Sequence, residues 1–408
     1  MTATGTEADP AHPARTAHPA RTVLVTGDSA ATATVAAATA LHAARRGHRT
    51  LLLAADDPHR TLDALLGTRL DAAPAEYAPG LRVARIDEQA AFRQAFGEVS
   101  GRLKTVLDLL GAEEPDPEEL TALPGTGRLA LLRALHGADA DVLVVAAPPP
   151  AELIAALALP EQLDRYLARL LPEQRQAARA LRPLLAAVAG VPMPAEWLYE
   201  ARGRAAAGLA RARAAVTAPG TSVRLAVEAA ALRPDELGRI RAGLALHGHR
   251  PDAVVVHRAL PAGAAGSPDP WLAGIARHQE ERLAGLAAEL AGIPLLTSRE
   301  PEVALEGVAA ELYGDGDGPA PAGPAPWTVE DRLAEDGLLV WHLALPGADR
   351  ADLDLVRRGD ELVVGIGSYR RILALPSALR RCTVAGAGLA DGVLAVRFAP
   401  DPALWPRG

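Results

Sequence analysis

Cysteine, lysine and methionine are almost absent from this sequence. Its 408 residues include one cysteine, Cys382, one lysine, Lys104, and two methionines. A lone cysteine excludes a disulfide within the chain and a zinc site built from cysteines. Aromatic residues are also scarce, with 5 Trp, 5 Tyr and 3 Phe. The core therefore has to be built from alanine, leucine and valine.

Long apolar runs and an excess of basic charge are lacking too. No uninterrupted apolar stretch reaches the roughly 18 residues that suggest a membrane span. The chain carries 42 basic and 50 acidic side chains, a net charge of −8, which argues against a general nucleic-acid binder. Residues 1–21 are polar and rich in proline, without the apolar segment of a secretory signal. We expect a disordered tail there and a cytoplasmic protein.

Buried strands alternate with helical patterns from residue 22 onward. Val23, Leu24 and Val25 form a short apolar run that ends in Thr26-Gly27, and residues 32–46 read as an alanine-rich helix. This alternation predicts an α/β fold with a doubly wound, mostly parallel sheet. Further apolar runs lie at 49–54, 81–86, 141–146, 222–227, 252–256 and 294–296.

The rest of the chain divides by composition. Between about 88 and 218, leucine, alanine and arginine repeat at helical spacing around one strand, which predicts a helical subdomain within a domain spanning 22–313. Residues 314–326 hold only Gly, Asp, Pro and Ala and are typical of a linker. Alternating runs in 327–408 predict a small antiparallel β-sandwich.

The connection after the first strand stands where a P-loop belongs. A P-loop needs glycines so that backbone N–H groups wrap the phosphates, a lysine for their charge, and a hydroxyl for Mg²⁺. Residues 27–34 read Gly-Asp-Ser-Ala-Ala-Thr-Ala-Thr, with one glycine and no basic residue. Asp28 would place a negative charge beside the phosphates.

Residues 23–40 and 43–53 nevertheless resemble the opening of the ArsA family. That family includes the arsenite-pump ATPase and the ATPase that targets tail-anchored membrane proteins. Its members begin with G-K-G-G-V-G-K-T-T. In that comparison Thr32 replaces the P-loop lysine, Ala33 replaces the Mg²⁺-binding threonine, and the first lysine is missing near Gly27. The resemblance continues to residue 313 and implies the P-loop NTPase type of fold.

The segment after the second strand resembles the first switch of this family, S-T-D-P-A-H. It reads Ala-Ala-Asp-Asp-Pro-His over residues 54–59, so that Asp56 or Asp57 takes the place of the water-activating aspartate. Arg60 follows directly, and we expect it to form a salt bridge with one of the two.

Two further segments resemble the family but lack its polar residues. Residues 141–149 resemble D-V-V-V-V-D-T-A-P, with Ala146 in place of the Mg²⁺-orienting aspartate. Residues 254–261 resemble V-V-V-N-R-V-L-P, with His257 in place of the adenine-reading asparagine. The resemblance implies vestigial catalytic candidates, Asp56 and Asp57, and a degenerate nucleotide pocket of Gly27, Ser29, Thr32, Thr34 and His257.

The C-terminal strands resemble a second family, the small heat-shock (α-crystallin-like) proteins. The resemblance lies in Leu-Ala-Leu-Pro-Gly-Ala at 343–348, Gly-Asp-Glu-Leu at 359–362 and Gly-Val-Leu-Ala-Val at 392–396. The Ile-x-Ile motif by which those proteins assemble is missing after Phe398. We expect a domain packed on the core rather than a polydisperse chaperone.

These substitutions remove charge neutralisation and metal placement together, the main terms of phosphoryl transfer. We therefore expect a pseudo-ATPase without cofactor or metal, acting through protein binding. It would be chaperone-like, or the silent subunit of a homo- or heterodimer with an ArsA-like subunit. The alternative is a weak ATPase that holds Mg-ATP through backbone amides and Asp56. A small-molecule pocket lined by Thr32, Thr34, Asp56 and His257 has no positive support. Arsenite transport is disfavoured because Cys382 alone supplies too few thiols.

Overall fold

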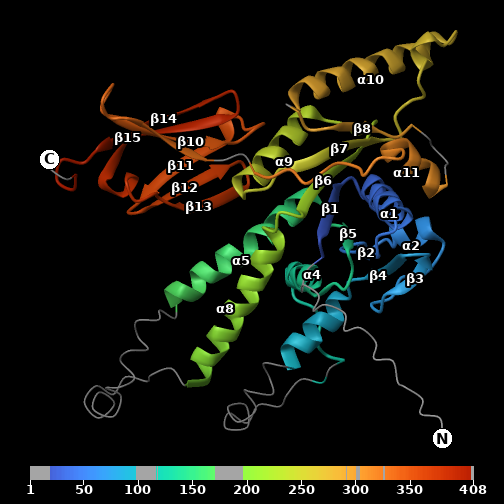
Figure 1. Ribbon diagram of the computed structural model, residues 1–408, viewed down its shortest axis with the longest axis horizontal. Helices are drawn as coiled ribbons and strands as arrows, with labels where there is room; N and C mark the ends of the chain where they lie inside the picture. The colour runs from blue at the N-terminus through green and yellow to red at the C-terminus, as the bar shows by residue number, and fades with distance from the viewer. Residues whose placement is uncertain are drawn as a thin grey trace, which may run out of the picture.

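A mostly parallel eight-stranded sheet forms the core of the computed structural model (Figure 1). The structure describes residues 19–97, 116, 118–170, 196–290, 292–299, 304–324 and 327–405. Lys104, most of the expected N-terminal tail and parts of the predicted helical subdomain lie outside them. The strand order is β3-β4-β2-β5-β1-β6-β7-β8, with only β3 antiparallel. The strands are β1 (Arg21–Gly27), β2 (Thr50–Ala54), β3 (Ala75–Ala78), β4 (Leu81–Arg85), β5 (Val142–Ala146), β6 (Thr221–Glu228), β7 (Pro251–His257) and β8 (Leu295–Thr297).

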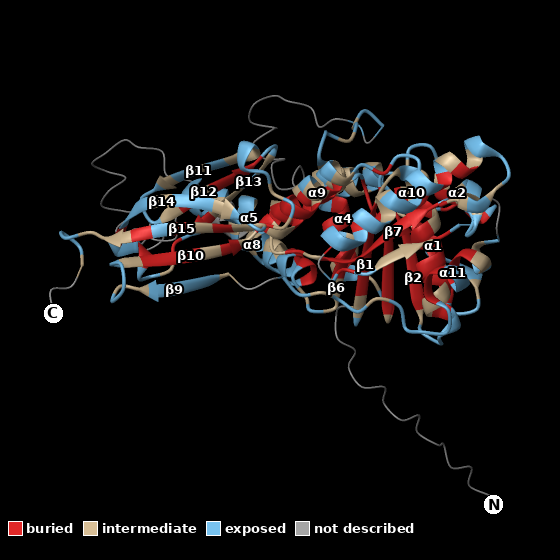
Figure 2. Cartoon of the chain, turned by 90° about the horizontal axis from the view of Figure 1, so that it is seen from above, coloured by how far each residue is buried: buried red, intermediate tan, exposed pale blue. Residues whose placement is uncertain are grey.

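Helices cover both faces of this sheet because its strands are apolar on both sides. In β1, Val23 and Val25 pack with α1 (Ser29–Arg45), α2 (Thr61–Leu66) and α11 (Leu305–Tyr313), whereas Leu24 packs with the helices of the other face. Figure 2 shows the resulting buried layer. The predicted α/β class is confirmed. The other face carries α4 (Thr126–Gly137), α5 (Pro150–Leu170), α8 (Glu196–Val216), α9 (Pro234–Leu246) and α10 (Pro270–Glu289), with a short 3-10 turn η2 (Ala264–Gly266).

The C-terminal domain consists of two antiparallel sheets, as the sequence predicts. One has the order β14-β15-β10-β9 and the other β11-β12-β13. Among the helices that the structure describes, none combines the length and apolarity that crossing a membrane requires. The elements are β9 (Thr328–Arg332), β10 (Leu338–Ala344), η3 (Arg350–Asp352), β11 (Leu353–Arg358), β12 (Glu361–Ile366), β13 (Tyr369–Ala374), η4 (Leu379–Arg381), β14 (Cys382–Ala390) and β15 (Val393–Pro400).

Helix α9 belongs to both hydrophobic cores. Its Leu237 and Leu244 pack beneath the parallel sheet, while Ala242 and Leu246 belong to the core of the C-terminal domain. A Cβ on Gly347 of that domain would lie 2.5 Å from the carbonyl oxygen of Gly238 in α9. Only glycine, with its positive φ of 81°, allows the two backbones to approach so closely.

Ion pairs from α5 reinforce this contact. Arg371 of β13 pairs with Glu161 at 2.9 Å and donates to the carbonyl oxygen of Leu246 at 2.8 Å. Glu361 of β12 pairs with Arg165 and Arg169. The C-terminal domain is therefore docked on the core by apolar and charged contacts.

The first part of the predicted linker, residues 315–319, is hydrogen-bonded to the core. His42 and Arg46 of α1 hydrogen-bond to the carbonyl oxygens of Gly316 and Asp315, and Arg21 of β1 donates to Pro319 at 3.1 Å. The composition predicts a linker, and in its first part the basic side chains at the amino end of the sheet bind its carbonyl oxygens.

Candidate functional site

One residue connects the first strand to the first helix. β1 ends at Gly27 and α1 begins at Ser29, so that only Asp28 lies between them. A Cβ on Gly27 would lie 1.8 Å from the carbonyl oxygen of Ala226 in β6, and its φ is 148°. No residue other than glycine fits there. The connection is thus a tight turn pressed against the end of β6.

The Asp28 carboxylate faces away from the helix N-terminus. It accepts a hydrogen bond from the backbone N–H of Glu228 at 2.8 Å, and the Asp28 N–H donates to Ala226 at 3.0 Å. We expected Asp28 beside a phosphate, but its side chain anchors the turn to β6. Residues 30–34 consequently form helical turns of α1 and not a wrapped loop.

A cavity of about 230 Å³ lies at the start of α1. Gly27, Ser29 and Thr32 contribute to its lining, as predicted, together with the ends of β2 and β5. The buried Oγ1 of Thr32 has no hydrogen-bond partner in the described structure. Thr34 does not line this cavity, and its hydroxyl donates to the carbonyl oxygen of Ala30 at 3.0 Å.

Within the described ranges, the titratable side chains that line this cavity are Asp56, Asp57 and His59, without lysine or arginine. The Asp57 carboxylate accepts from the N–H groups of Thr61 at 2.8 Å and Leu62 at 3.1 Å. It therefore caps the start of α2. Its oxygens are used in these structural hydrogen bonds.

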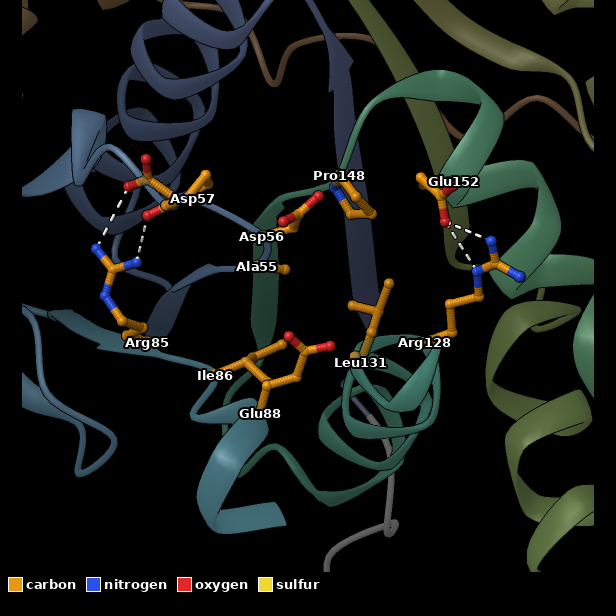
Figure 3. A pocket seen from close by; sticks show the side chains of 13 residues that line it. Ala55, Asp56, Asp57, Arg85, Ile86, Glu88, Arg128, Leu131, Pro148 and Glu152 are labelled. Atoms are coloured by element: carbon orange, nitrogen blue, oxygen red, sulfur yellow. Dashed lines mark hydrogen bonds and ion pairs between the residues drawn. The ribbon is translucent and has the colours of Figure 1, made fainter. Parts of the chain in front are cut away.

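A basic residue of β4 completes this arrangement. Arg85 donates to the Asp57 carbonyl oxygen at 2.9 Å and approaches its carboxylate at 3.4 Å (Figure 3). It also pairs with Asp63 at 2.5 Å. Arg60 also pairs with Asp63, at 2.7 Å. The predicted salt bridge between Arg60 and Asp56 or Asp57 was wrong because Asp63 lies one turn away on the same helix.

Asp56 stands apart from this network. It adopts a positive φ of 52°, is exposed, and has no ion pair or hydrogen bond within the described residues. It lines the 230 Å³ cavity and also a second one of about 370 Å³. Figure 3 shows the Asp56 and Glu88 carboxylates directed into this second cavity.

The second cavity lies between the ends of β2 and β4 and the starts of α4 and α5. Its two arginines are already paired, Arg85 as above and Arg128 with Glu152 at 2.5 Å. A Cβ on Gly127 would lie 1.9 Å from Oε1 of Glu88, so that carboxylate packs directly against the first turn of α4 and a larger residue there would displace it. No sequence pattern points to Glu88, Arg128 or Glu152, because they come from separate elements.

Comparison with protein-family models identifies the larger domain. Residues 20–289 match the model described as anion-transporting ATPase, which is well over half of the chain. The chain belongs to the ArsA ATPase family. Residues 336–398 match a model described as an HSP20-like domain found in ArsA, so both predicted resemblances are confirmed.

Several curated proteins are similar to this ArsA-family chain over most of its length. The Streptomyces coelicolor protein SCO2128 is 50% identical over 387 residues, which cover 92% of this chain and 96% of the relative. The Mycobacterium tuberculosis protein Rv2184c is 30% identical, with coverages of 91% and 94%. An Aquifex aeolicus protein named "Putative arsenical pump-driving ATPase 1" is 24% identical, with coverages of 85% and 91%.

His257 is not brought to the ArsA-type cavity. It ends β7, two strands away from β1, and lines neither of the cavities described above. It is buried, its Nδ1 has no partner in the described structure, and burial together with the nearby Arg258 lowers its pKa. Across the described ranges, no group of three or more His, Cys, Asp or Glu side chains is placed to hold a metal ion.

Proposed function

We propose that this ArsA-family protein has lost ATP hydrolysis and acts by binding another protein. The observation that carries the first part is the lining of the cavity at α1. Asp56 and Asp57 line it, and no lysine or arginine among the described residues does. Phosphoryl transfer depends on cations that neutralise the developing charge, so this cavity repels the group it would have to stabilise.

The backbone supports the same conclusion. A P-loop surrounds phosphates with several consecutive N–H groups, and it needs a loop long enough to do so. Here a single residue separates β1 from α1. The free N–H groups are limited to those of the first helical turn, at a cavity whose described lining holds two aspartates and no lysine.

Exposed apolar side chains support the second part. Trp271 is 73% exposed and Ile275 is 42% exposed, one turn apart on the first half of α10. Tryptophan is enriched where interfaces concentrate their binding energy. In the ArsA-type ATPases that this chain resembles, nucleotide lies at the dimer interface, so a degenerate subunit can still complete the site of an intact one.

The docked C-terminal domain supports action as a single body. Ala242 and Leu246 of α9 lie in the core of that domain, and Arg371 ties it to α5. A chaperone-like contact by its exposed strand edges would therefore be transmitted to the core. Such edges pair with extended chains through their free N–H and C=O groups.

Nucleotide binding tests the first part. We expect full-length protein titrated with ATP or ADP, with and without Mg²⁺, to show no association tighter than about 1 mM, which is about −4 kcal/mol. Calorimetry measures this directly. Micromolar binding that requires Mg²⁺ would overturn the proposal. Loss of that binding in Asp56→Ala but not in Asp235→Ala, a substitution on α9, would favour the weak ATPase instead.

Association with an intact ArsA-type ATPase tests the second part. We expect a one-to-one complex in sedimentation experiments. Trp271→Asp is expected to lower its affinity by at least about tenfold, because a charge replaces a side chain that the partner would bury. Leu129→Asp is the control, since Leu129 is an apolar residue on α4 that is 41% exposed, close to the 42% of Ile275. Monomers in every mixture, or equal effects of the two substitutions, would contradict the role of α10.

A further inference from the structure

A third cavity lies at the seam between the two domains. It measures about 210 Å³ and is lined by residues from α9, the start of β7, the end of α10 and the turns of the C-terminal domain. Its walls are mainly apolar. The core contributes Ala245, Leu290 and Ile293, and the C-terminal domain contributes Ala344, Pro346 and Val393.

A buried arginine breaks this apolar lining. Arg241 of α9 is only 6% exposed, yet its Nε has no hydrogen-bond partner in the described structure. One Nη donates to the carbonyl oxygen of Glu289 at 3.3 Å, a long bond. A guanidinium carries five N–H donors, and burying them without acceptors is costly. Burial lowers the pKa of Arg241, the nearby Glu289 carboxylate opposes this shift, and Arg250 adds to it.

The other charged groups of the cavity leave it positive. Arg250 lines it as well, and His249 is neutral because burial and Arg371 lower its pKa to about 4. Asp391 is the carboxylate in the lining. It is exposed and makes no ion pair with Arg241 or any other described residue. Among the described residues, the charged groups of the lining are thus the guanidinium groups of Arg241 and Arg250 and the Asp391 carboxylate, and the Glu289 carboxylate acts on Arg241 from outside the lining.

We propose that this cavity binds a small monocarboxylate with an apolar body. The carboxylate accepts hydrogen bonds from the guanidinium of Arg241, and the apolar body lies against Leu290, Ile293 and Val393. Carboxylate matches the planar fork of a guanidinium and forms charge-assisted hydrogen bonds with it. A fully charged phosphate suits the site less well, because walls of leucine, isoleucine, valine and proline would leave most of its oxygens without donors.

The cavity lies where a bound ligand would affect the docking of the two domains. Both domains line it, so a bound molecule contacts both and stabilises their docked arrangement. This proposal stands independently of the one for the nucleotide cavity, since the two sites share no residue.

The test uses full-length protein and a series of simple acids. Butanoate, pentanoate and benzoate are titrated by calorimetry and ligand-observed NMR, beside butanamide, benzamide and inorganic phosphate. We expect the carboxylates to bind at least about tenfold more tightly than the matching amides, because only they pair with the cation. Benzoate is expected to exceed phosphate by a similar factor.

Substitutions in the lining test whether the carboxylates bind in this cavity. Arg241→Met keeps the apolar stem and is expected to remove the preference for acid over amide. Arg277→Met, at an exposed position of α10, is the control and keeps it. If Arg241→Met does not fold, Val393→Trp fills the cavity from the opposite wall and is expected to abolish binding. Equal affinity for acids and amides, no binding of any carboxylate at about 10 mM, or unchanged binding in Val393→Trp would overturn the proposal.

Discussion

Replacing Asp252 by alanine is expected to lower the free energy of unfolding by about 3–5 kcal/mol, the usual effect of breaking a buried ion pair from one side. Asp252 is fully buried at the amino end of β7 and faces Arg224 of β6, whose side chain is 3% exposed. Arg224 donates to the carboxylate from Nε at 3.1 Å and from one Nη at 2.9 Å. Ser222 and Arg21 also donate to it, each at 2.7 Å.

Denaturant unfolding of Asp252→Ala measures this effect, and Asp317→Ala is its control. Asp317 pairs with Arg46 at the same distance as Asp252 with Arg21, 2.7 Å, but its side chain is 86% exposed. Exposed pairs contribute less than about 1 kcal/mol. Equal losses in the two variants would show that burial of the charges is not what makes Asp252 important.

The hydrogen bonds of Arg224 also hold α11, the last helix of the ATPase-like domain, against α1. Its second Nη donates to the hydroxyl of Tyr313 at 2.8 Å and to Thr39 at 3.2 Å. Tyr313 ends α11, and Thr39 lies in α1. Asp252→Ala is therefore expected to loosen α11 and the segment that follows it along with the sheet.

Much of the parallel sheet could be predicted because buried strands are continuous apolar runs. Runs such as Leu51–Ala54 or Val142–Ala146 have no other stable position than the inside of a sheet. The strands that were missed are those that depend on their neighbours. β9 reads Thr-Val-Glu-Asp-Arg and β14 contains two glycines, so only pairing with β10 and β15 makes them strands.

The candidate site was predictable residue by residue but not in its geometry. The sequence places Thr32 where the ArsA family has lysine, and the structure places Thr32 in the cavity wall. It could not reveal that Asp28 turns toward Glu228 or that Asp57 caps α2, because both depend on backbone positions from other elements. His257 was grouped with these residues by family position, although it ends β7 and β6 lies between β7 and β1.

The buried charges were also beyond sequence reasoning. Nothing in Val-Arg-Leu within a strand shows that the arginine is inside, and its partner Asp252 follows 28 residues later. Arg241 is similar, since an arginine on an amphipathic helix normally faces water. Its burial results from docking of the C-terminal domain against α9, which contributes to the core of that domain.

Acid is expected to destabilise the protein through two histidines that follow α9. Burial, with Arg371 close by, lowers the pKa of His247 to about 3 and that of His249 to about 4. In the unfolded chain both pKa values return to about 6.5, so below that pH the unfolded state binds more protons than the folded one. Stability is therefore complete above about pH 7 and falls as the pH drops toward 4.

The two histidines together are expected to remove about 4 kcal/mol of stability at pH 5, or about 2 kcal/mol each at 1.36 kcal/mol per pKa unit. Unfolding midpoints measured from pH 7.5 to pH 5 give the slope for the native protein and for His247→Gln/His249→Gln. The slope, and not the absolute stability, is the readout, because glutamine also changes packing. His278→Gln, at an exposed position of α10, is expected to leave the slope unchanged. If the stability of the double variant falls with pH as steeply as that of the native protein, then carboxylates govern the loss of stability in acid, and the two histidines near Arg371 do not.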